Sequence, residues 1–248
     1  LDHMGPLTRS VRDAAVTMNA LAGYDRRDDT SSTRPVEDYV PVNGCSIRGL
    51  RIGWPENYYF ERVDPSVKTA VERMGALAES LGASIIPVRV PEISAINTVG
   101  RVILMSEASA FFDTLGASRD TFGADVLALY DQGRLLAATD YVNAQRLRRM
   151  MQREFAKLWD RIDCLFTPTV PIGAPPIGAL TVEIEGQTED TRLATTRFVR
   201  AINVLGLPAL SIPCGVTDEH MPIGLQVVGK PFAEAEILRI GAALEDAT

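Results

Sequence analysis

The chain has 248 residues, of which 46% are hydrophobic, and this is enough apolar material for one large domain over residues 1–248. A net charge of -7 disfavours a nucleic-acid-binding surface and fits a soluble cytoplasmic protein. The three cysteines are odd in number and far apart, so they predict neither a disulfide framework nor a metal site. No apolar run approaches the roughly 18 residues of a membrane span, so we expect no membrane partner.

The first pattern is an amphipathic helix. Ser10 is a good N-cap, Asp13 follows three residues later, and apolar residues recur at helical spacing until Gly23. The polar segment from Tyr24 to Thr33 has no periodicity and is predicted to be a surface loop.

The second pattern predicts a βαβ unit. A short β-type run over Leu50 to Trp54 is followed by Asp64-Pro65, an N-cap with proline at the first helical position. The helix should end at Gly82, and a second strand should lie within Ser84 to Val90. Short connections between strand, helix and strand favour a parallel strand pair with a right-handed crossover.

Residues 91–162 are predicted to be almost entirely helical. Helices are expected near Ile93 to Leu115, near Ala124 to Gln132, and from an N-cap at Thr139 or Asp140 onward. Spacing on the third helix predicts an inward face, made by Val142, Leu147, Met150, Met151, Leu158 and Trp159. Its arginines and lysine lie mostly on the outward face. Because acids are interspersed and the chain is acidic, we interpret that face as solvated.

The last third predicts the centre of a sheet. The run over Leu180 to Gln187 is an exposed edge or flap, and a helix over Thr191 to Ile202 follows it. Two short apolar runs, Ala209 to Pro213 and Ile223 to Val228, predict buried central strands joined like a hairpin. A closing helix follows Pro231. The expected class is α/β, a mixed and partly parallel β-sheet with helices on both faces.

Several phrases then carry a family resemblance. GLPALSIPCG followed by MPIGLQVVG resembles the C-terminal end of the amidase signature family, serine hydrolases that cleave carboxamides with a Ser, cis-Ser, Lys triad. The run Asp163 to Thr169 resembles the family's D-x-L-x-T-P-T strand, and the phrase Gly5 to Ser10 also fits. The resemblance spans the chain and implies the C-terminal part of an amidase signature domain.

The family's catalytic groups have no counterpart here. The resemblance implies a lysine near the family's N-terminus and a Gly/Ser-rich loop bearing both serines and the oxyanion amides, and neither occurs in this sequence. Ser211, between Leu210 and Ile212, is interpreted as a satisfied core hydroxyl outside any G-x-S-x-G elbow. His3 and His220 do not suggest a Ser/His/Asp site. We therefore predict no catalytic residue in this chain, although Asp2 could brace a catalytic loop.

The sequence does offer candidate substrate-binding residues. Ligands bind at strand ends in open α/β sheets, which indicates Thr167, Thr169 and the Pro-rich loop after them. Gln226 is a second candidate, since an amide in an apolar strand needs a partner. Backbone-bonding turn residues and a core amide explain these three residues equally well. No cofactor and no metal are expected.

Three functions remain open. The first is an amidase of small carboxamides whose C-terminal part is inactive alone, and a homodimer is compatible with it. The second is the amidase-type subunit of a tRNA-dependent amidotransferase. The resemblance implies an aspartate before the Asn-x-x-Gly phrase in that branch, and Thr195 to Phe198 stand there instead. The third is a non-catalytic module derived from an amidase.

Overall fold

The computed structural model describes residues 1, 3–41, 44–116 and 118–248, so the expectation for Asp2 lies outside the described residues. The elements in chain order are α1 (Val11–Leu21), β1 (Arg51–Pro55), α2 (Pro65–Ser80), β2 (Ser84–Val88), α3 (Ile93–Leu115), η1 (Arg119–Thr121), α4 (Ala124–Arg134), α5 (Ala138–Ala156), η2 (Lys157–Asp160), β3 (Cys164–Pro168), β4 (Thr181–Ile184), β5 (Gln187–Asp190), α6 (Thr191–Thr196), α7 (Arg200–Leu205), β6 (Ala209–Val216), β7 (Pro222–Val228) and α8 (Glu234–Glu245).

A mixed five-stranded sheet organises the molecule, with strand order β2-β1-β3-β7-β6. Strand β1 is parallel to both β2 and β3, whereas β7 is antiparallel to β3 and to β6. The predicted βαβ unit is confirmed, since β1 and β2 pair in parallel from Arg51 opposite Ser84 to Pro55 opposite Val88. The predicted flap forms the separate antiparallel hairpin β4-β5.

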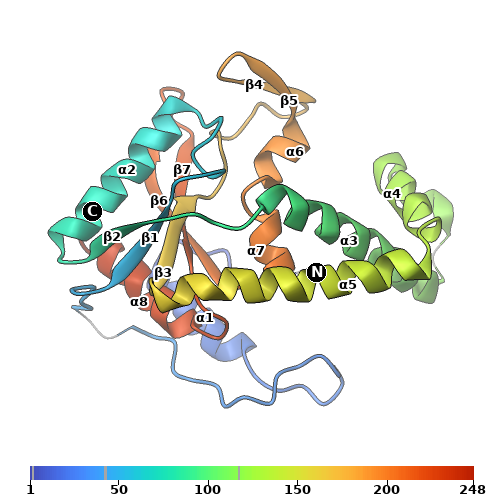
Figure 1. The fold of residues 1–248 in the computed structure, drawn as a ribbon, viewed down its shortest axis with the longest axis horizontal. Helices are drawn as coiled ribbons and strands as arrows, with labels where there is room; N and C mark the ends of the chain where they lie inside the picture. The colour runs from blue at the N-terminus through green and yellow to red at the C-terminus, as the bar shows by residue number, and fades with distance from the viewer. Residues whose placement is uncertain (2, 42–43, 117) are drawn as a thin grey trace.

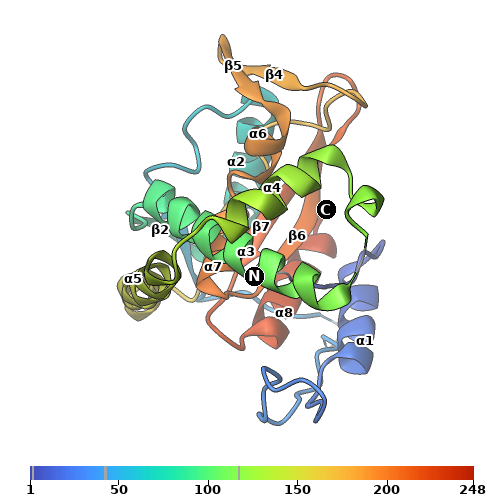
Figure 2. The same ribbon diagram turned by 90° about the vertical axis from the view of Figure 1, so that its right-hand side faces the viewer.

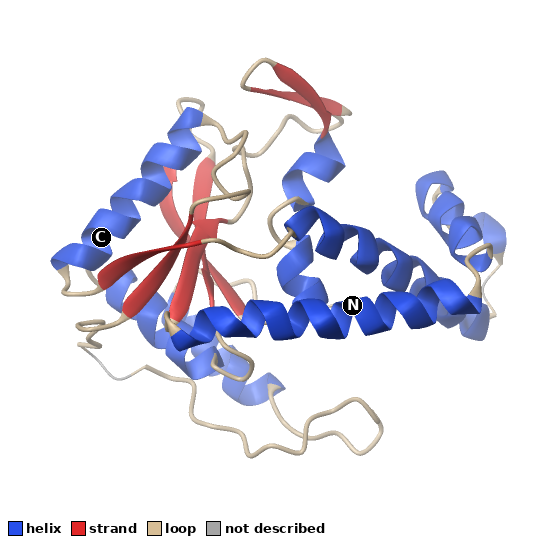
Figure 3. Cartoon of the chain, viewed as in Figure 1, coloured by secondary structure: helices blue, strands red, loops and turns tan. Residues whose placement is uncertain are grey.

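Helices cover both faces of this sheet, as predicted (Figure 1). Helices α1, α2 and α8 pack with Phe166, Leu225 and Val227 on one face. On the other face, α3, α7 and the end of α5 pack with Leu165 and Val228. Side chains alternate between the two faces of a strand, so neighbouring residues of β3 and β7 enter different cores. Figure 3 shows the strands between these two helical layers.

The predicted caps of the first two helices are confirmed. The Ser10 side chain accepts a hydrogen bond from the Asp13 backbone N–H, and Asp64 accepts one from Ser66 ahead of Pro65. These bonds satisfy amide groups that have no partner inside the helix.

Strand β6 differs from the prediction of a buried central strand. It pairs only with β7, and no strand in the described part of the chain pairs with its outer side. Ile212 is buried, but Ala209, Ser211 and Pro213 are exposed. The prediction of a buried strand holds for β7 and is wrong for β6, because one of the two runs occupies the edge of the sheet.

A helical arm made of α3, α4 and α5 projects away from the sheet (Figures 1 and 2). Helix α3 has the predicted bounds, but α5 begins at Ala138 with Ala137 as its N-cap, so the predicted cap at Thr139 or Asp140 is wrong. Both residues lie inside the first turn. There the carboxylate of Asp140 is favoured by the helix dipole without capping the helix.

The inward face predicted for this third helix is correct only in part. Leu158 is buried, whereas Val142, Leu147 and Met150 are 46%, 44% and 61% exposed. The buried residues within α5 are Ala144 and Phe155. The helix therefore contacts the rest of the molecule along a narrower stripe than its apolar pattern indicates.

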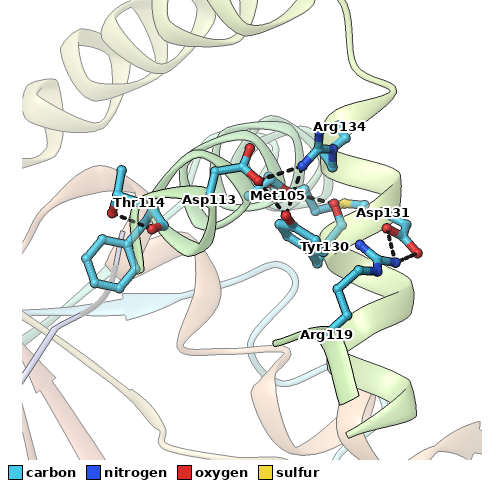
Figure 4. A network of polar contacts seen from close by, with 9 residues as sticks. Met105, Asp113, Thr114, Arg119, Tyr130, Asp131 and Arg134 are labelled. Carbon is cyan, nitrogen blue, oxygen red and sulfur yellow. Dashed lines mark hydrogen bonds and ion pairs between the residues drawn. The ribbon is translucent and has the colours of Figure 1, made fainter. Parts of the chain in front are cut away.

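Helix α4 approaches α3 closely at Gly133. A Cβ atom there would lie 2.1 Å from both the Met105 carbonyl oxygen and the Ser109 Oγ. Polar contacts surround this crossing, as Figure 4 shows. Tyr130 Oη donates to Asp113 at 2.5 Å, and Arg134 contacts the same carboxylate at 2.5 Å. These bonds tie the two helices together at the end of the arm.

The predicted helix over Thr191 to Ile202 is two short helices, α6 and α7, which residues 197–199 separate. The Arg197 guanidinium is buried and forms an ion pair with Glu189 of β5 at 3.0 Å. It also donates to the carbonyl oxygen of Arg62. Near the C-terminus, α8 is the predicted closing helix and begins at Glu234.

Candidate functional site

The sheet carries one polar row across its last three strands. Thr167 of β3 lies opposite Gln226 of β7, which in turn lies opposite Ser211 of β6. Gln226 Nε2 donates to Thr167 Oγ1 at 2.8 Å, and the two residues are 3% and 0% exposed. The amide that needed a partner therefore finds it in the hydroxyl of the neighbouring strand, since buried polar groups are costly when unpaired.

Next to this row, the hydroxyls of Thr169 and Ser211 form a pair. Thr169 Oγ1 is 2.7 Å from Ser211 Oγ, and the Thr169 backbone N–H donates to the Gly224 carbonyl oxygen at 2.9 Å. A Cβ atom on Gly224 would lie 2.7 Å and 2.8 Å from the two hydroxyl oxygens. A glycine at this position is what leaves room for the pair.

These groups border a groove of about 770 Å³ along the open side of β6. Thr169, Ser211 and Gln226 line it, together with residues 3–11 and 207–213 and parts of α7 and α8. The start of α1 is fixed beside the groove because the Glu245 carboxylate of α8 accepts a hydrogen bond from the Val11 backbone N–H at 3.0 Å. Thr167 is not part of the lining and reaches the groove only through Gln226.

The structure therefore separates the three predicted substrate-binding residues. Thr169 and Gln226 line the groove, whereas Thr167 is a buried support for Gln226. The role of all three in binding substrate stays a prediction.

The prediction that Ser211 lies in the core is wrong, because the residue is exposed on an edge strand and bonded to Thr169. The alternation of Leu210 and Ile212 with Ala209, Ser211 and Pro213 is the signal that could have indicated a half-exposed strand.

Asn203 is a groove residue that the sequence did not single out. Its side-chain nitrogen lies 2.7 Å from His3 Nδ1, which is also 3.1 Å from the Leu1 carbonyl oxygen. In the described residues, neither histidine is hydrogen-bonded to a serine, threonine or cysteine side chain. The pair joins the N-terminal segment to α7 and offers polar groups at the rim of the groove.

Cys164 and Cys214 do not line the groove, and neither is an activated thiol. Burial raises the pKa of the Cys214 thiol to about 12, and burial also raises the pKa of Cys164 far above its usual range. Both thiols are therefore protonated at neutral pH, and the thiolate is the reactive form. No group of three or more potential metal-ligating side chains occurs in the part of the chain that the structure describes. Hydroxyl and amide groups suit hydrogen bonding to a polar ligand.

Side chains of the segment Thr195 to Phe198 form hydrogen bonds to neighbouring residues of this chain. Thr196 Oγ1 accepts a hydrogen bond from Arg200, while the Arg197 guanidinium turns toward Glu189. Burial lowers the pKa of Arg197, and the Glu189 carboxylate opposes that effect. This segment presents no carboxylate of its own.

Known proteins resemble this chain in sequence and in fold. A family model described as Amidase matches residues 1–238. The chain belongs to the Amidase family. An amidase of Pseudomonas putida is 41% identical over 250 residues, which cover 100% of this chain and 53% of that protein. A glutamyl-tRNA(Gln) amidotransferase subunit of Acidobacterium capsulatum is 35% identical over 270 residues, covering 99% of this chain and 56% of that protein.

Solved amidase-family structures share the architecture. The structure of a vestigial protein complex, described for the origins of an s-triazine catabolic enzyme, matches with a TM-score of 0.87 and 31% identity. The match covers 98% of this chain and 52% of that one. The structure of a bacterial aryl acylamidase of the amidase signature family also matches, with a TM-score of 0.82 and 25% identity over 98% of this chain and 52% of that one, which confirms the expected amidase signature fold. The chain spans about half the length of the curated relatives that it matches.

None of the helices that the structure describes has the length and apolar character to span a membrane.

Proposed function

We propose that this chain, as one domain over residues 1–248, is the C-terminal part of an amidase that hydrolyses the C–N bond of a small carboxamide in the cytoplasm. The observation that carries the proposal is that Thr169, Ser211 and Gln226 together line a groove on the open edge of an amidase-family sheet. In this proposal Thr169 and Gln226 contact the amide substrate and Thr167 holds Gln226. The acting enzyme needs no cofactor and can be a homodimer.

The chemistry of this proposal requires groups from outside the chain. Amide hydrolysis needs a nucleophile, a group that accepts and returns its proton, and donors for the oxyanion. The Thr169 and Ser211 hydroxyls pair with each other, and in the described residues neither is hydrogen-bonded to a histidine, lysine or carboxylate side chain. In this proposal the Ser, cis-Ser, Lys triad is supplied by another segment, and the chain alone is inactive.

The test has two arms. The chain alone is incubated with simple and aryl amides, and product release that a serine-directed reagent abolishes would place the catalytic serine within residues 1–248. The chain is then joined to a segment that carries the family's lysine and Gly/Ser-rich loop. Hydrolysis should appear in this fusion, and Thr169→Val should raise KM more than it lowers kcat, because Thr169 contributes to binding.

The amidase-type subunit of a tRNA-dependent amidotransferase is the second candidate. It is favoured by the 35% identity to the Acidobacterium capsulatum protein over 99% of this chain. It is disfavoured by the segment Thr195 to Phe198, where the side chain of Thr196 is hydrogen-bonded to Arg200 and that of Arg197 to Glu189. Glutamine-dependent transfer and stable co-purification with the other subunits of an amidotransferase would support it. A chain that retains no such partner agrees with the amidase or with a non-catalytic module.

A further inference from the structure

A small apolar pocket lies at the C-terminal end of α5, where the arm joins the sheet. Its volume is about 290 Å³, and it shares only Leu207 with the groove along β6. Six of its seven lining residues are apolar or aromatic, and the seventh is a glutamine: Phe155, Ala156, Trp159, Leu205, Leu207, Pro231 and Gln152. The dimensions suit one aromatic or large aliphatic side chain, the kind of residue that anchors protein interfaces.

A row of positive charge begins at the mouth of this pocket. Arg146, Arg149 and Arg153 are exposed on α5, at spacings of three and four residues that place them on one face. They cover about 10 Å along the helix axis. None of the three contacts a carboxylate within ion-pair distance among the described residues, whereas the nearby Lys157 is paired with Glu154 at 2.6 Å.

The same face is more apolar than a solvated face requires. Val142 and Met150, which the sequence pattern placed in the core, are 46% and 61% exposed among the arginines. Like charges at these spacings destabilise a helix slightly, so carboxylates from another molecule would be favoured there. This cluster of positive charge and exposed apolar side chains is a local feature of α5, since the chain as a whole carries a net charge of -7.

We propose that this outer face of α5 docks an acidic helical segment of a partner protein. A large apolar side chain of the segment enters the pocket between Phe155 and Leu205, and carboxylates one turn apart face Arg146, Arg149 and Arg153. The charge row and the pocket are adjacent, since Gln152 and Ala156 lie one turn from Arg149 and Arg153. A nucleic acid would use the charges but not the pocket, and the net negative charge of the chain opposes a long polyanion.

The probe is a synthetic helical peptide with one tryptophan and three glutamates spaced to match the arginines. Its binding to the full chain is followed by fluorescence anisotropy at low ionic strength. The affinity should fall about tenfold in the Arg149→Glu, Arg153→Glu double variant. The double variant Arg73→Glu, Arg48→Glu makes the same charge change away from this face and should bind normally. Added salt should weaken the complex.

The pocket is tested separately with Ala156→Trp, which fills its mouth from an exposed position and leaves the core untouched. This variant, and a peptide with alanine in place of tryptophan, should each lose about tenfold in affinity. Absence of peptide binding overturns the proposal. It is also overturned if Ala156→Trp has no effect, or if RNA or anionic phospholipid vesicles bind this face more tightly than the peptide.

Discussion

At the scale of single residues, the site depends on how buried polar groups are paired. Thr167 and Gln226 are both buried, and each is the side-chain partner of the other at 2.8 Å. Ser211 and Thr169 form a more exposed hydroxyl pair at the groove. A buried polar atom that loses its partner costs more than the bond contributed, so these positions should be coupled.

The first prediction is a double-mutant cycle on the buried pair. Thr167→Val leaves the Gln226 amide without its acceptor, and Gln226→Leu leaves the Thr167 hydroxyl without its donor. Each single variant should lose about 1–3 kcal/mol in the free energy of unfolding. The double variant should lose less than the sum of the two, because no unpaired polar group remains. Urea unfolding of the four proteins measures the coupling, and strictly additive losses would show that the bond contributes nothing.

At the scale of elements, an ion pair between Arg51 and Asp163 joins β1 to the residue that precedes β3. Arg51 donates to the Asp163 carboxylate from its side chain at 2.8 Å and from its backbone N–H at 2.9 Å. The hydrogen bond from the Arg51 side chain holds the pKa of Asp163 below its usual value. A carboxyl whose pKa is lowered in the folded state stabilises the protein above its unfolded pKa of about 3.9. This stability is lost as the pH falls through the lowered value.

The second prediction follows from that sign. Asp163→Asn should lower the free energy of unfolding by about 1–2 kcal/mol at pH 7. The difference from the native sequence should shrink below about pH 4, where the native carboxyl also becomes protonated. Thermal unfolding across this pH range provides the measurement. Asp160→Asn removes a nearby exposed carboxylate that has no ion-pair partner among the described residues, and it serves as the control. An unchanged difference at low pH would exclude the charge as the cause.

The third prediction concerns the crossing of α3 and α4. Gly133→Ala places a methyl group 2.1 Å from a backbone oxygen of α3, and backbone cannot move aside as the end of a side chain can. The variant should lose about 2–3 kcal/mol of stability through overpacking. Leu135→Ala changes a side chain that is 87% exposed and should cost less than about 0.5 kcal/mol. Equal unfolding midpoints for the two variants would contradict the close approach of α4 to α3 at Gly133.

The sequence predicts these elements well where the signal is local. The N-caps Ser10 and Asp64 and the bounds of α3 follow from neighbouring residues, so no knowledge of the sheet was needed. The exposure of Ser211 depends on which strand lies beside β6, and an apolar run is equally compatible with a central strand or an edge strand. The exposure of Val142 and Met150 depends on how much of α5 its neighbours cover. Groove residues such as Asn203 are brought together only by the fold.

At the scale of the whole molecule, the main feature is the open side of β6, which leaves one edge of the sheet without a neighbouring strand in the described residues. The strand is eight residues long and half-exposed, and its outer side carries no strand among the described residues. Unpaired backbone groups on such an edge can pair with another chain, which proteins commonly prevent with a charged side chain. The exposed residues of β6 are Ala209, Ser211, Pro213, Gly215 and Val216, none of which is charged.

The fourth prediction is therefore that isolated chains associate through this edge. Val216 is 60% exposed at the end of β6, and Val216→Lys should weaken association about tenfold, because pairing would bury the new charge. Val16→Lys makes the same change at a residue of α1 that is 53% exposed and should leave association unchanged. Sedimentation velocity over a range of concentrations separates the two. If the native chain stays monomeric throughout, the N-terminal segment shields the edge, and residues 3–11 rather than a second chain determine the access of substrate to the groove.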